Sequence, residues 1–225
     1  MNRHDRRSNP ALPVEATLAT AAGHVTAGRF GAAIREIERN SAARGHPTGQ
    51  NIIGNAHLRA GKPEAALQAF DAALQLAPQM PEAHLSRGVA LQELGRPQDA
   101  LAAFDAAIAN RAVYPLGHFN RGNVLRDLRR AADAVAAFDE AVRLDPRFAE
   151  AHLNRGFALL DQEKDESALK AFDLALRLRP GWKEAGVGRA TALERLHRPA
   201  AALEAIDMAL AVDPDDGEAL AIRGR

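Results

Sequence analysis

Small and apolar residues return along this chain at fixed intervals of 34 residues, and polar residues fill the positions between them. Three octapeptides show the interval directly: HLSRGVAL at 84–91, HFNRGNVL at 118–125 and HLNRGFAL at 152–159. Each interval divides into two stretches of about 12 to 14 residues, which is the length of an ordinary globular helix. The pattern therefore predicts an all-α chain built from one repeated pair of helices.

The repeat keeps its register over most of the sequence. Successive repeats start at Pro47, Pro81, Pro115, Ala149 and Lys183, and these residues are numbered as the first position of each repeat. A looser unit begins near Val14. The twentieth, twenty-fourth and twenty-seventh positions are the most regular. They are Ala66, Ala100, Ala134, Ala168 and Ala202; Phe70, Phe104, Phe138, Phe172 and Ile206; and Ala73, Ala107, Ala141, Ala175 and Ala209. We expect units near 14–46, 47–80, 81–114, 115–148, 149–182 and 183–216, which make about six helical hairpins.

Glycine and proline mark where each helix ends. Gly61 and Gly95 stand where a first helix needs a left-handed residue after its last turn. Prolines follow at the first turn of the second helix, where a missing N–H costs nothing, and others close the units. They are Pro63, Pro97 and Pro199, and then Pro78, Pro146, Pro180 and Pro214.

Composition supports helices and narrows the function. Aromatic residues make up 4%, and 29 basic residues balance 29 acidic ones, so no net field favours nucleic acid. Cysteine is absent, which excludes disulfides and thiolate zinc sites. No apolar run approaches the roughly 20 residues of a membrane span, and the polar start has no signal-peptide core. We expect a cytoplasmic protein with no membrane contact.

The repeat resembles the tetratricopeptide repeat (TPR) family over about 14–225. The resemblance rests on the positions above and on glycine at the eighth position: Gly54, Gly88, Gly122 and Gly156. It implies an α-solenoid, a right-handed superhelix whose concave groove is lined by first helices. Close packing agrees, because small residues at the eighth and twentieth positions let backbones approach while the phenylalanines fill the space beside them.

Two repeated residues depart from the family pattern. The family's tryptophan at the fourth position is replaced by His84, His118 and His152. These cannot share one metal ion, because stacked helices stand roughly 8 to 10 Å apart while ligands lie about 2 Å from a metal. We interpret the histidines as packing residues and expect no metal or other cofactor.

The family's leucine at the seventh position is an arginine in four repeats. In five repeats, an aspartate directly follows the phenylalanine or isoleucine at the twenty-fourth position, in the second helix of the pair. The arginines are Arg87, Arg121, Arg155 and Arg189, and the aspartates are Asp71, Asp105, Asp139, Asp173 and Asp207. A guanidinium at an inter-helix seam needs an acceptor, so we expect Arg–Asp pairs between units, with Asp139 reaching Arg155 or Arg121. Binding of an anionic ligand by these arginines is the alternative.

The stripe of each first helix that is left free by packing should face the groove. In the three central units it comprises Glu82, Ser86, Val89 and Glu93; Leu116, Asn120, Asn123 and Asp127; and Glu150, Asn154, Phe157 and Asp161, with Leu85, Phe119 and Leu153 beside them. Except for Leu116, we take these residues as the candidate peptide-binding groove. Their acids, with Glu184, favour a partner that carries basic residues.

Asn120 and Asn154 occupy the sixth position. There the chain resembles the repeat regions of O-linked N-acetylglucosamine transferases, whose asparagine ladder grips a peptide backbone. An amide can satisfy a peptide unit whatever its side chain. Ser86 could extend the ladder, while Ile52 and Gly188 interrupt it. The alternative is that asparagine is only a tolerated polar residue on an exposed helix.

No catalytic motif is recognisable. The chain has no P-loop, no HExxH and no nucleophile elbow, and its four serines stand near no evident histidine and acid set. The segment GVGRAT at 186–191 falls inside a first helix, with no strand before it. We therefore expect a non-catalytic protein.

The two ends carry further expectations. Residues 1–13 read as a disordered basic arm, and 217–225 repeat the opening of a unit, either as a capping helix or as the first half of a further repeat. An uncapped end would favour self-association. The main hypothesis is a protein-interaction scaffold that holds a partner segment. The alternative is the substrate-docking region of a larger enzyme, such as a bacterial glycosyltransferase; RNA recognition would need a basic groove.

Overall fold

The computed structural model describes residues 13–111, 113–212, 214, 217 and 220–221. The elements over this part of the chain are thirteen α-helices, and no strand occurs among the described residues. The chain divides into an N-terminal unit, Met1–Arg111, and a C-terminal unit, Ala112–Arg225. The all-α prediction is confirmed.

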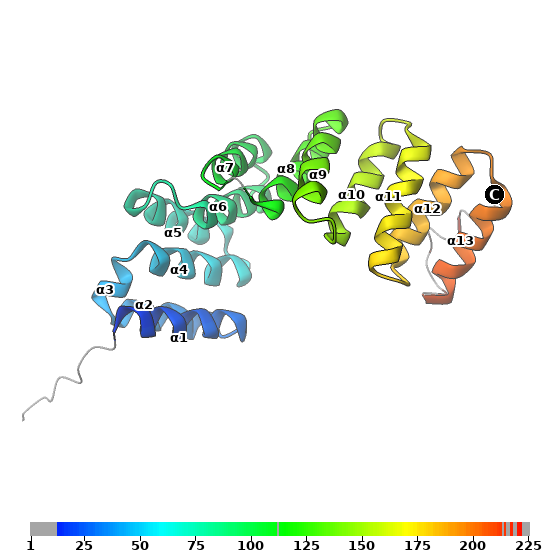
Figure 1. Ribbon diagram of the computed structural model, residues 1–225. Coiled ribbons are helices and arrows are strands. Elements are labelled where there is room, and N and C mark those ends of the chain that lie inside the picture. Colours follow the sequence, from blue (N-terminus) through cyan, green and yellow to red (C-terminus); the bar gives the residue numbers. More distant parts are fainter. Residues whose placement is uncertain (1–12, 112, 213, 215–216, 218–219, 222–225) are drawn as a thin grey trace, which may run out of the picture. The chain divides into compact units, whose positions relative to one another are not determined.

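The N-terminal unit holds the helices drawn from blue to blue-green in Figure 1. They are α1 (Val14–Thr26), α2 (Phe30–Arg39), α3 (Ser41–Arg44), α4 (Pro47–Arg59), α5 (Pro63–Leu76), α6 (Pro81–Glu93) and α7 (Pro97–Ala109). Helices adjacent in sequence form antiparallel pairs, and α4 also contacts α6, the first helix of the next repeat. Consecutive hairpins therefore stack on one another within this unit.

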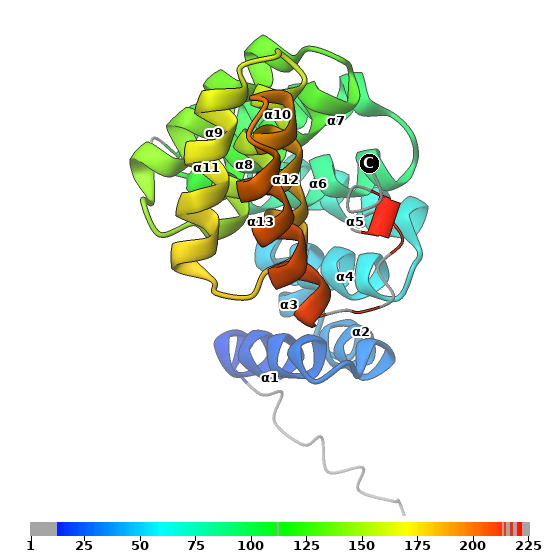
Figure 2. The ribbon, with the colours of Figure 1, turned by 90° about the vertical axis from the view of Figure 1, so that its right-hand side faces the viewer.

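The C-terminal unit repeats the same arrangement. Its helices are α8 (Pro115–Asp127), α9 (Ala131–Leu144), α10 (Ala149–Leu160), α11 (Asp165–Leu178), α12 (Lys183–Arg195) and α13 (Pro199–Val212). The first helices contact in the order α8, α10 and α12, and each second helix lies against the first helix that follows it. Figures 1 and 2 show α11, α12 and α13 side by side.

The turn inside each hairpin needs one residue with a left-handed backbone. Gly61 and Gly95 have φ of +69° and +68°, as the sequence predicts, and Pro63 and Pro97 begin the following helices. The next three repeats reach the same conformation without glycine. The residues are Arg129, Glu163 and His197, with φ of +60°, +58° and +56°. In these repeats the flanking helices impose the left-handed backbone on a residue other than glycine, at a conformational free-energy cost that glycine would avoid.

In four of the hairpins, a phenylalanine ring of the second helix packs directly against a glycine of the first helix. A Cβ added at Gly88 would lie 2.5 Å from Phe104 Cε1, and one at Gly156 would lie 2.6 Å from Phe172 Cε1. Both rings are fully buried. The eighth-position glycine therefore makes room for the ring itself, a correction to the expectation that the ring only fills space beside two closely packed backbones.

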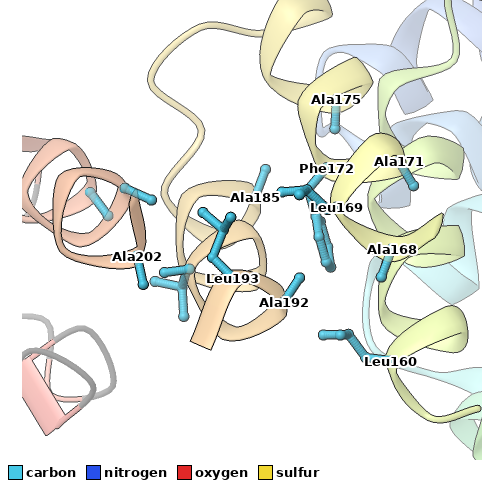
Figure 3. Close-up of a cluster of buried hydrophobic side chains, with 14 of the residues drawn as sticks. Leu160, Ala168, Leu169, Ala171, Phe172, Ala175, Ala185, Ala192, Leu193 and Ala202 are labelled. Carbon is cyan, nitrogen blue, oxygen red and sulfur yellow. The ribbon is translucent and has the colours of Figure 1, made fainter. Parts of the chain in front are cut away.

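The same rings also join neighbouring hairpins. Figure 3 shows Phe172 pointing from α11 toward α12, in a cluster to which Ala185 and Leu193 contribute from α12. A Cβ at Gly188, on α12, would lie 2.6 Å from the Phe172 ring. One phenylalanine thus packs on its own first helix and on the first helix of the next repeat.

The first repeat differs from the others by the four-residue helix α3, which the sequence pattern did not predict. Asn40 caps it by accepting hydrogen bonds from the backbone N–H groups of Ala42 and Ala43, and its Nδ2 donates to Thr17 Oγ1 at 2.9 Å. This buried hydrogen bond fixes the start of α3 against α1.

Two expectations fall largely on residues that the structure does not describe. The predicted basic arm lies outside the described residues except for Pro13, and so does most of 217–225. Among the described helices, none is long and apolar enough to cross a membrane.

Candidate functional site

The first helices of the C-terminal unit together line an open depression made of two adjoining pockets. Its residues come from α8, α10, α12 and the turns that follow α8 and α10, and are Arg126, Asp127, Arg129, Leu153, Asn154, Phe157, Asp161, Lys183, Glu184 and Val187. We call this surface the α8–α10–α12 groove. Asp127, Leu153, Asn154, Phe157 and Asp161 were predicted from the sequence as site residues.

A pair of asparagines bridges two helices of the groove. Asn154 Nδ2, on α10, donates a hydrogen bond to Asn123 Oδ1, on α8, at 2.7 Å, and both side chains are half-buried. The bond uses one donor and one acceptor, so Asn154 Oδ1 and the Asn123 NH₂ group remain for other partners. The pair therefore offers a carbonyl and an amide together, the two groups that a peptide unit needs.

Phe157 supplies the apolar part of the groove. Its ring meets the buried Phe172 ring edge-on, with centroids 5.1 Å apart and planes at 70°. The Arg126 guanidinium carbon lies 5.8 Å from the centroid of the Phe157 ring, within the range of a cation–π contact. The phenylalanine is thus held in place by the core and by an arginine from α8.

The charges of the groove are balanced, and this differs from the acidic surface that the stripe pattern indicates. Three acids, Asp127, Asp161 and Glu184, line it with three basic residues: Arg126, Arg129 and Lys183. The basic residues lie at the first, twelfth and fifteenth positions of their repeats, outside the predicted stripe. Their long side chains reach the pockets from the helix ends, which helical spacing alone does not reveal. A preference for a basic partner stays a prediction.

Two leucines expected to flank the groove face are instead buried. Leu85 is 8% exposed and Leu153 is 7% exposed, because the fifth position packs toward the core. Leu153 still borders one pocket, where Val187 of the next repeat lies at the same position. Leu85 and Leu153 therefore offer little exposed area to a ligand.

Other predicted residues of the C-terminal unit have structural partners. Phe119 packs on Phe148 and Phe138, with centroids 4.8 Å and 6.0 Å away. Asn120 is half-buried on α8, and the exposed Glu150 lies 3.8 Å from Arg179. Of the polar and aromatic residues predicted for this unit, Asn154 and Phe157 line the groove, and Asn123 bonds to Asn154.

The N-terminal unit carries a weaker version of the asparagine pair. Ser86 Oγ, on α6, donates to Asn55 Oδ1, on α4, at 3.2 Å, and these residues hold the same repeat positions as Asn154 and Asn123. Val89 is half-buried and Glu93 is exposed, while Glu82 pairs with Arg111 at 3.0 Å. In these two places the sixth position therefore bonds to the ninth position of the preceding repeat, and a ladder that binds a peptide stays a prediction.

Two of the repeated histidines bond to the loop that precedes their own helix. His152 Nε2 lies 3.0 Å from the Pro146 carbonyl oxygen, and His84 Nε2 lies 2.8 Å from the Pro78 carbonyl oxygen. Since a carbonyl only accepts, each imidazole donates from Nε2 and ties the start of its helix to the preceding loop. No cluster of three potential metal ligands occurs among the described residues.

Comparison with known proteins gives the family directly. The family model described as tetratricopeptide repeat matches residues 18–81, 53–115 and 119–181. A search of curated proteins found no match. The narrower resemblance to the repeat regions of O-linked N-acetylglucosamine transferases stays a prediction.

Solved structures with the same fold are numerous and distant in sequence. YrrB, described as a TPR protein with an unusual peptide-binding site, is 22% identical with a TM-score of 0.71 over 85% of this chain and 97% of its own. The PilF structure from Pseudomonas aeruginosa is 15% identical, with a TM-score of 0.83 over 94% and 96%. MamA from Desulfovibrio magneticus RS-1 is 23% identical, with a TM-score of 0.70 over 76% and 97%. At these sequence identities the likeness shows a shared fold alone.

Proposed function

Because the chain belongs to the tetratricopeptide repeat family, we propose that it is a non-catalytic interaction scaffold that binds a peptide segment of a partner protein in the α8–α10–α12 groove. The observation that carries this proposal is Asn154, which lines the groove together with Phe157 and is held by its hydrogen bond to Asn123. A structure similar to this chain, that of YrrB, is described as having a peptide-binding site.

The geometry favours an extended segment. An extended peptide presents backbone C=O and N–H groups at regular intervals, and the asparagine pair provides one donor and one acceptor for them. Each such bond contributes about 0.5 to 1.5 kcal/mol net, so two bonds alone give weak binding. The Phe157 ring would add apolar contact with a neighbouring side chain of the peptide.

Balanced charges would favour a peptide that carries both signs of charge. Arg126 and Asp127 lie on α8, Lys183 and Glu184 lie on α12, and Arg129 and Asp161 lie in the turns after α8 and α10. A peptide with basic and acidic residues can pair with groups of each sign. The proposed partner is therefore a segment with an apolar or aromatic residue flanked by charges of both signs.

The proposal is tested with peptides selected by purified protein from a random displayed library, with affinities measured by fluorescence anisotropy. Asn123→Ala with Asn154→Ala should weaken a selected peptide by about tenfold or more, since two hydrogen bonds are lost. Asn110→Ala, at the exposed end of α7, is the matched control and should leave binding unchanged. Selected peptides that bind the double variant as tightly as the native protein would place the site elsewhere.

A further inference from the structure

Arg126 is a half-buried arginine of the α8–α10–α12 groove that lines both of its pockets. It makes a cation–π contact with the Phe157 ring, and no hydrogen bond or ion pair joins its guanidinium group to any residue that the structure describes. A guanidinium group carries five N–H donors, and removing them from water is costly unless an acceptor replaces the water. Within the described residues, the groove therefore holds a cation without a matching anion.

Comparable arginines of other repeats do have acceptors. Arg87, Arg155 and Arg189 are also half-buried, and each donates from Nε to an aspartate of the preceding second helix. Arg126 does not belong to that series, because it lies at the twelfth position of its repeat. The twelfth position of the other repeats is occupied by Leu58, Gln92, Leu160 and Glu194. The repeat architecture therefore does not require an arginine at this position.

The Arg126 guanidinium group is positioned by the aromatic ring beneath it. Its carbon lies 5.8 Å from the centroid of the Phe157 ring, and that ring is itself held edge-on against the buried Phe172 ring. The N–H groups lie along the edge of the planar guanidinium group, so contact with a ring leaves them available to an acceptor. Since the side chain is already held, binding an anion would cost it little further conformational entropy.

We propose, on the basis of the peptide-binding function proposed above, that Arg126 binds the side-chain carboxylate of an aspartate or glutamate in the partner segment. The two oxygens of a carboxylate match the guanidinium fork and accept two parallel hydrogen bonds from it. Arg126 belongs to both pockets, so a segment that fills the groove extends to either side of it. The carboxylate therefore comes from an internal residue of the segment rather than from its C-terminus.

The acids of the groove restrict the kind of anion that can bind beside Arg126. Asp127, Asp161 and Glu184 line the groove, and Arg129 adds a second positive charge to one pocket. A phosphate group carries a charge of about −1.5 to −2 at pH 7 and would be repelled by these acids more strongly than a singly charged carboxylate. An acidic side chain is therefore preferred over a phosphorylated one.

The test uses peptides that the native protein selects from a random displayed library, resynthesised with a free and with an amidated C-terminus. An acidic residue should recur at one internal position beside an apolar residue. Replacing it by the matching amide, Glu→Gln or Asp→Asn, should weaken binding to the native protein by about tenfold, because a charged hydrogen-bonded pair is lost. Amidation of the C-terminus should leave the affinity unchanged.

A double-mutant cycle assigns the carboxylate to Arg126. Arg126→Gln should weaken the acidic peptide by about tenfold and should have almost no effect on the amide peptide. Arg177→Gln, at an exposed arginine of α11, is the matched control and should leave both affinities unchanged. Independent effects of the two substitutions would show that Arg126 does not bind the carboxylate.

The native protein decides the question if Arg126→Gln does not fold. The Arg126 Nε–H resonance should then shift in NMR spectra when the acidic peptide binds, and it should shift much less with the amide peptide. Equal shifts with the two peptides, or no shift with either, overturn the proposal.

The remaining outcomes separate this inference from the peptide-binding function on which it rests. Selected peptides that lack a recurrent acidic residue overturn the role of Arg126, and the groove still stands as the binding site if Asn123→Ala with Asn154→Ala weakens those peptides. Binding lost on C-terminal amidation would assign Arg126 to a terminal carboxylate, and tighter binding of a phosphoserine peptide would assign it to a phosphate group. Either result contradicts the proposal. A library that yields no peptide removes the peptide-binding function and this inference with it.

Discussion

Arg155, on α10, donates a hydrogen bond from Nε to Asp139 Oδ1, on α9, at 2.5 Å. The same relationship recurs between Arg87 and Asp71 at 2.7 Å and between Arg189 and Asp173 at 2.8 Å. Each pair joins a second helix to the first helix of the following repeat, so the arginine at the seventh position links consecutive hairpins. The sequence-based prediction of an Arg–Asp pairing between repeats is confirmed for these three pairs.

The pair should stabilise the stack by a measurable but small amount. A double-mutant cycle with Arg155→Ala and Asp139→Ala should give a coupling of about 0.5 to 1 kcal/mol in urea unfolding, because the side chains are 26% and 48% exposed. The i,i+3 pair Arg96–Asp99, which is about half exposed, is the control and should couple more weakly. A coupling of zero for the Arg155 pair would mean that register is set by apolar packing alone.

Restoring the family residue separates this structural role from anion binding. Arg155→Leu removes the charge and keeps an apolar side chain at a partly buried seam, so a change in unfolding free energy is expected. Loss of ligand binding with unchanged stability would instead support the alternative that these arginines hold an anionic ligand.

Much of this fold could be predicted from the sequence because its determinants are local and repeated. Pro47, Pro81 and Pro115 begin α4, α6 and α8, and the left-handed turns fall at Gly61 and Gly95. The left-handed residues Arg129 and Glu163 carry no such signal, since their conformation is imposed by flanking helices. Helix α3 depends on the Asn40–Thr17 contact, which is specific to the first repeat.

The site was harder to predict than the fold. The helical stripe predicted Asn154, Phe157 and Asp161 on one surface, and these residues line the α8–α10–α12 groove. It could not show that Arg126 and Lys183 reach the same surface, because long side chains extend beyond the stripe on which they begin. Nor could it show that Leu153 is buried, since burial at the fifth position depends on how closely successive first helices pack.

Glu163→Gly should stabilise the protein. Glu163 has φ of +58°, which costs a non-glycine residue more than it costs glycine, so we expect a gain of about 0.5 to 1 kcal/mol in unfolding free energy. Lys164→Gly is the matched control, because Lys164 has φ of −94° and glycine there should destabilise. If both variants lose stability to the same degree in urea unfolding, the turn carries no relievable strain.

Gly188→Asn, which would extend the asparagines of the sixth position by one repeat, should destabilise the chain. Its Cβ would lie 2.6 Å from the fully buried Phe172 ring, so we expect a loss of about 1 to 3 kcal/mol in unfolding free energy. Gly23→Asn, on α1, is the control, because a Cβ there meets nothing within 4 Å. A neutral Gly188→Asn would show that the Phe172 ring can move away without cost.

Glu140 should titrate below its ordinary range. A hydrogen bond from Arg143, at 2.7 Å, lowers the pKa of the Glu140 carboxyl group. Because the folded-state pKa is depressed, the contribution of the pair is present above the unfolded-state pKa and is lost as pH falls through the folded-state value. NMR titration should show Arg143→Ala returning the pKa of Glu140 toward 4.5. An unchanged value would assign the shift to another neighbour.

His152→Ala should leave a cavity at the position of the buried imidazole ring. The imidazole is 6% exposed and bonds to the Pro146 carbonyl, so its removal should cost about 2 to 4 kcal/mol in unfolding free energy. Added 4-methylimidazole should then restore about 1.4 kcal/mol at ten times its Kd, because it binds only the folded state.

This rescue must exceed any stabilisation that the same ligand gives the native protein. His84→Ala is the comparison, since His84 holds the same position but is only half-buried and should lose less stability. Thermal unfolding measured across a ligand titration separates the cases. A destabilised His152→Ala that gains no more than the native protein would show that the space at the fourth position collapses when its ring is removed.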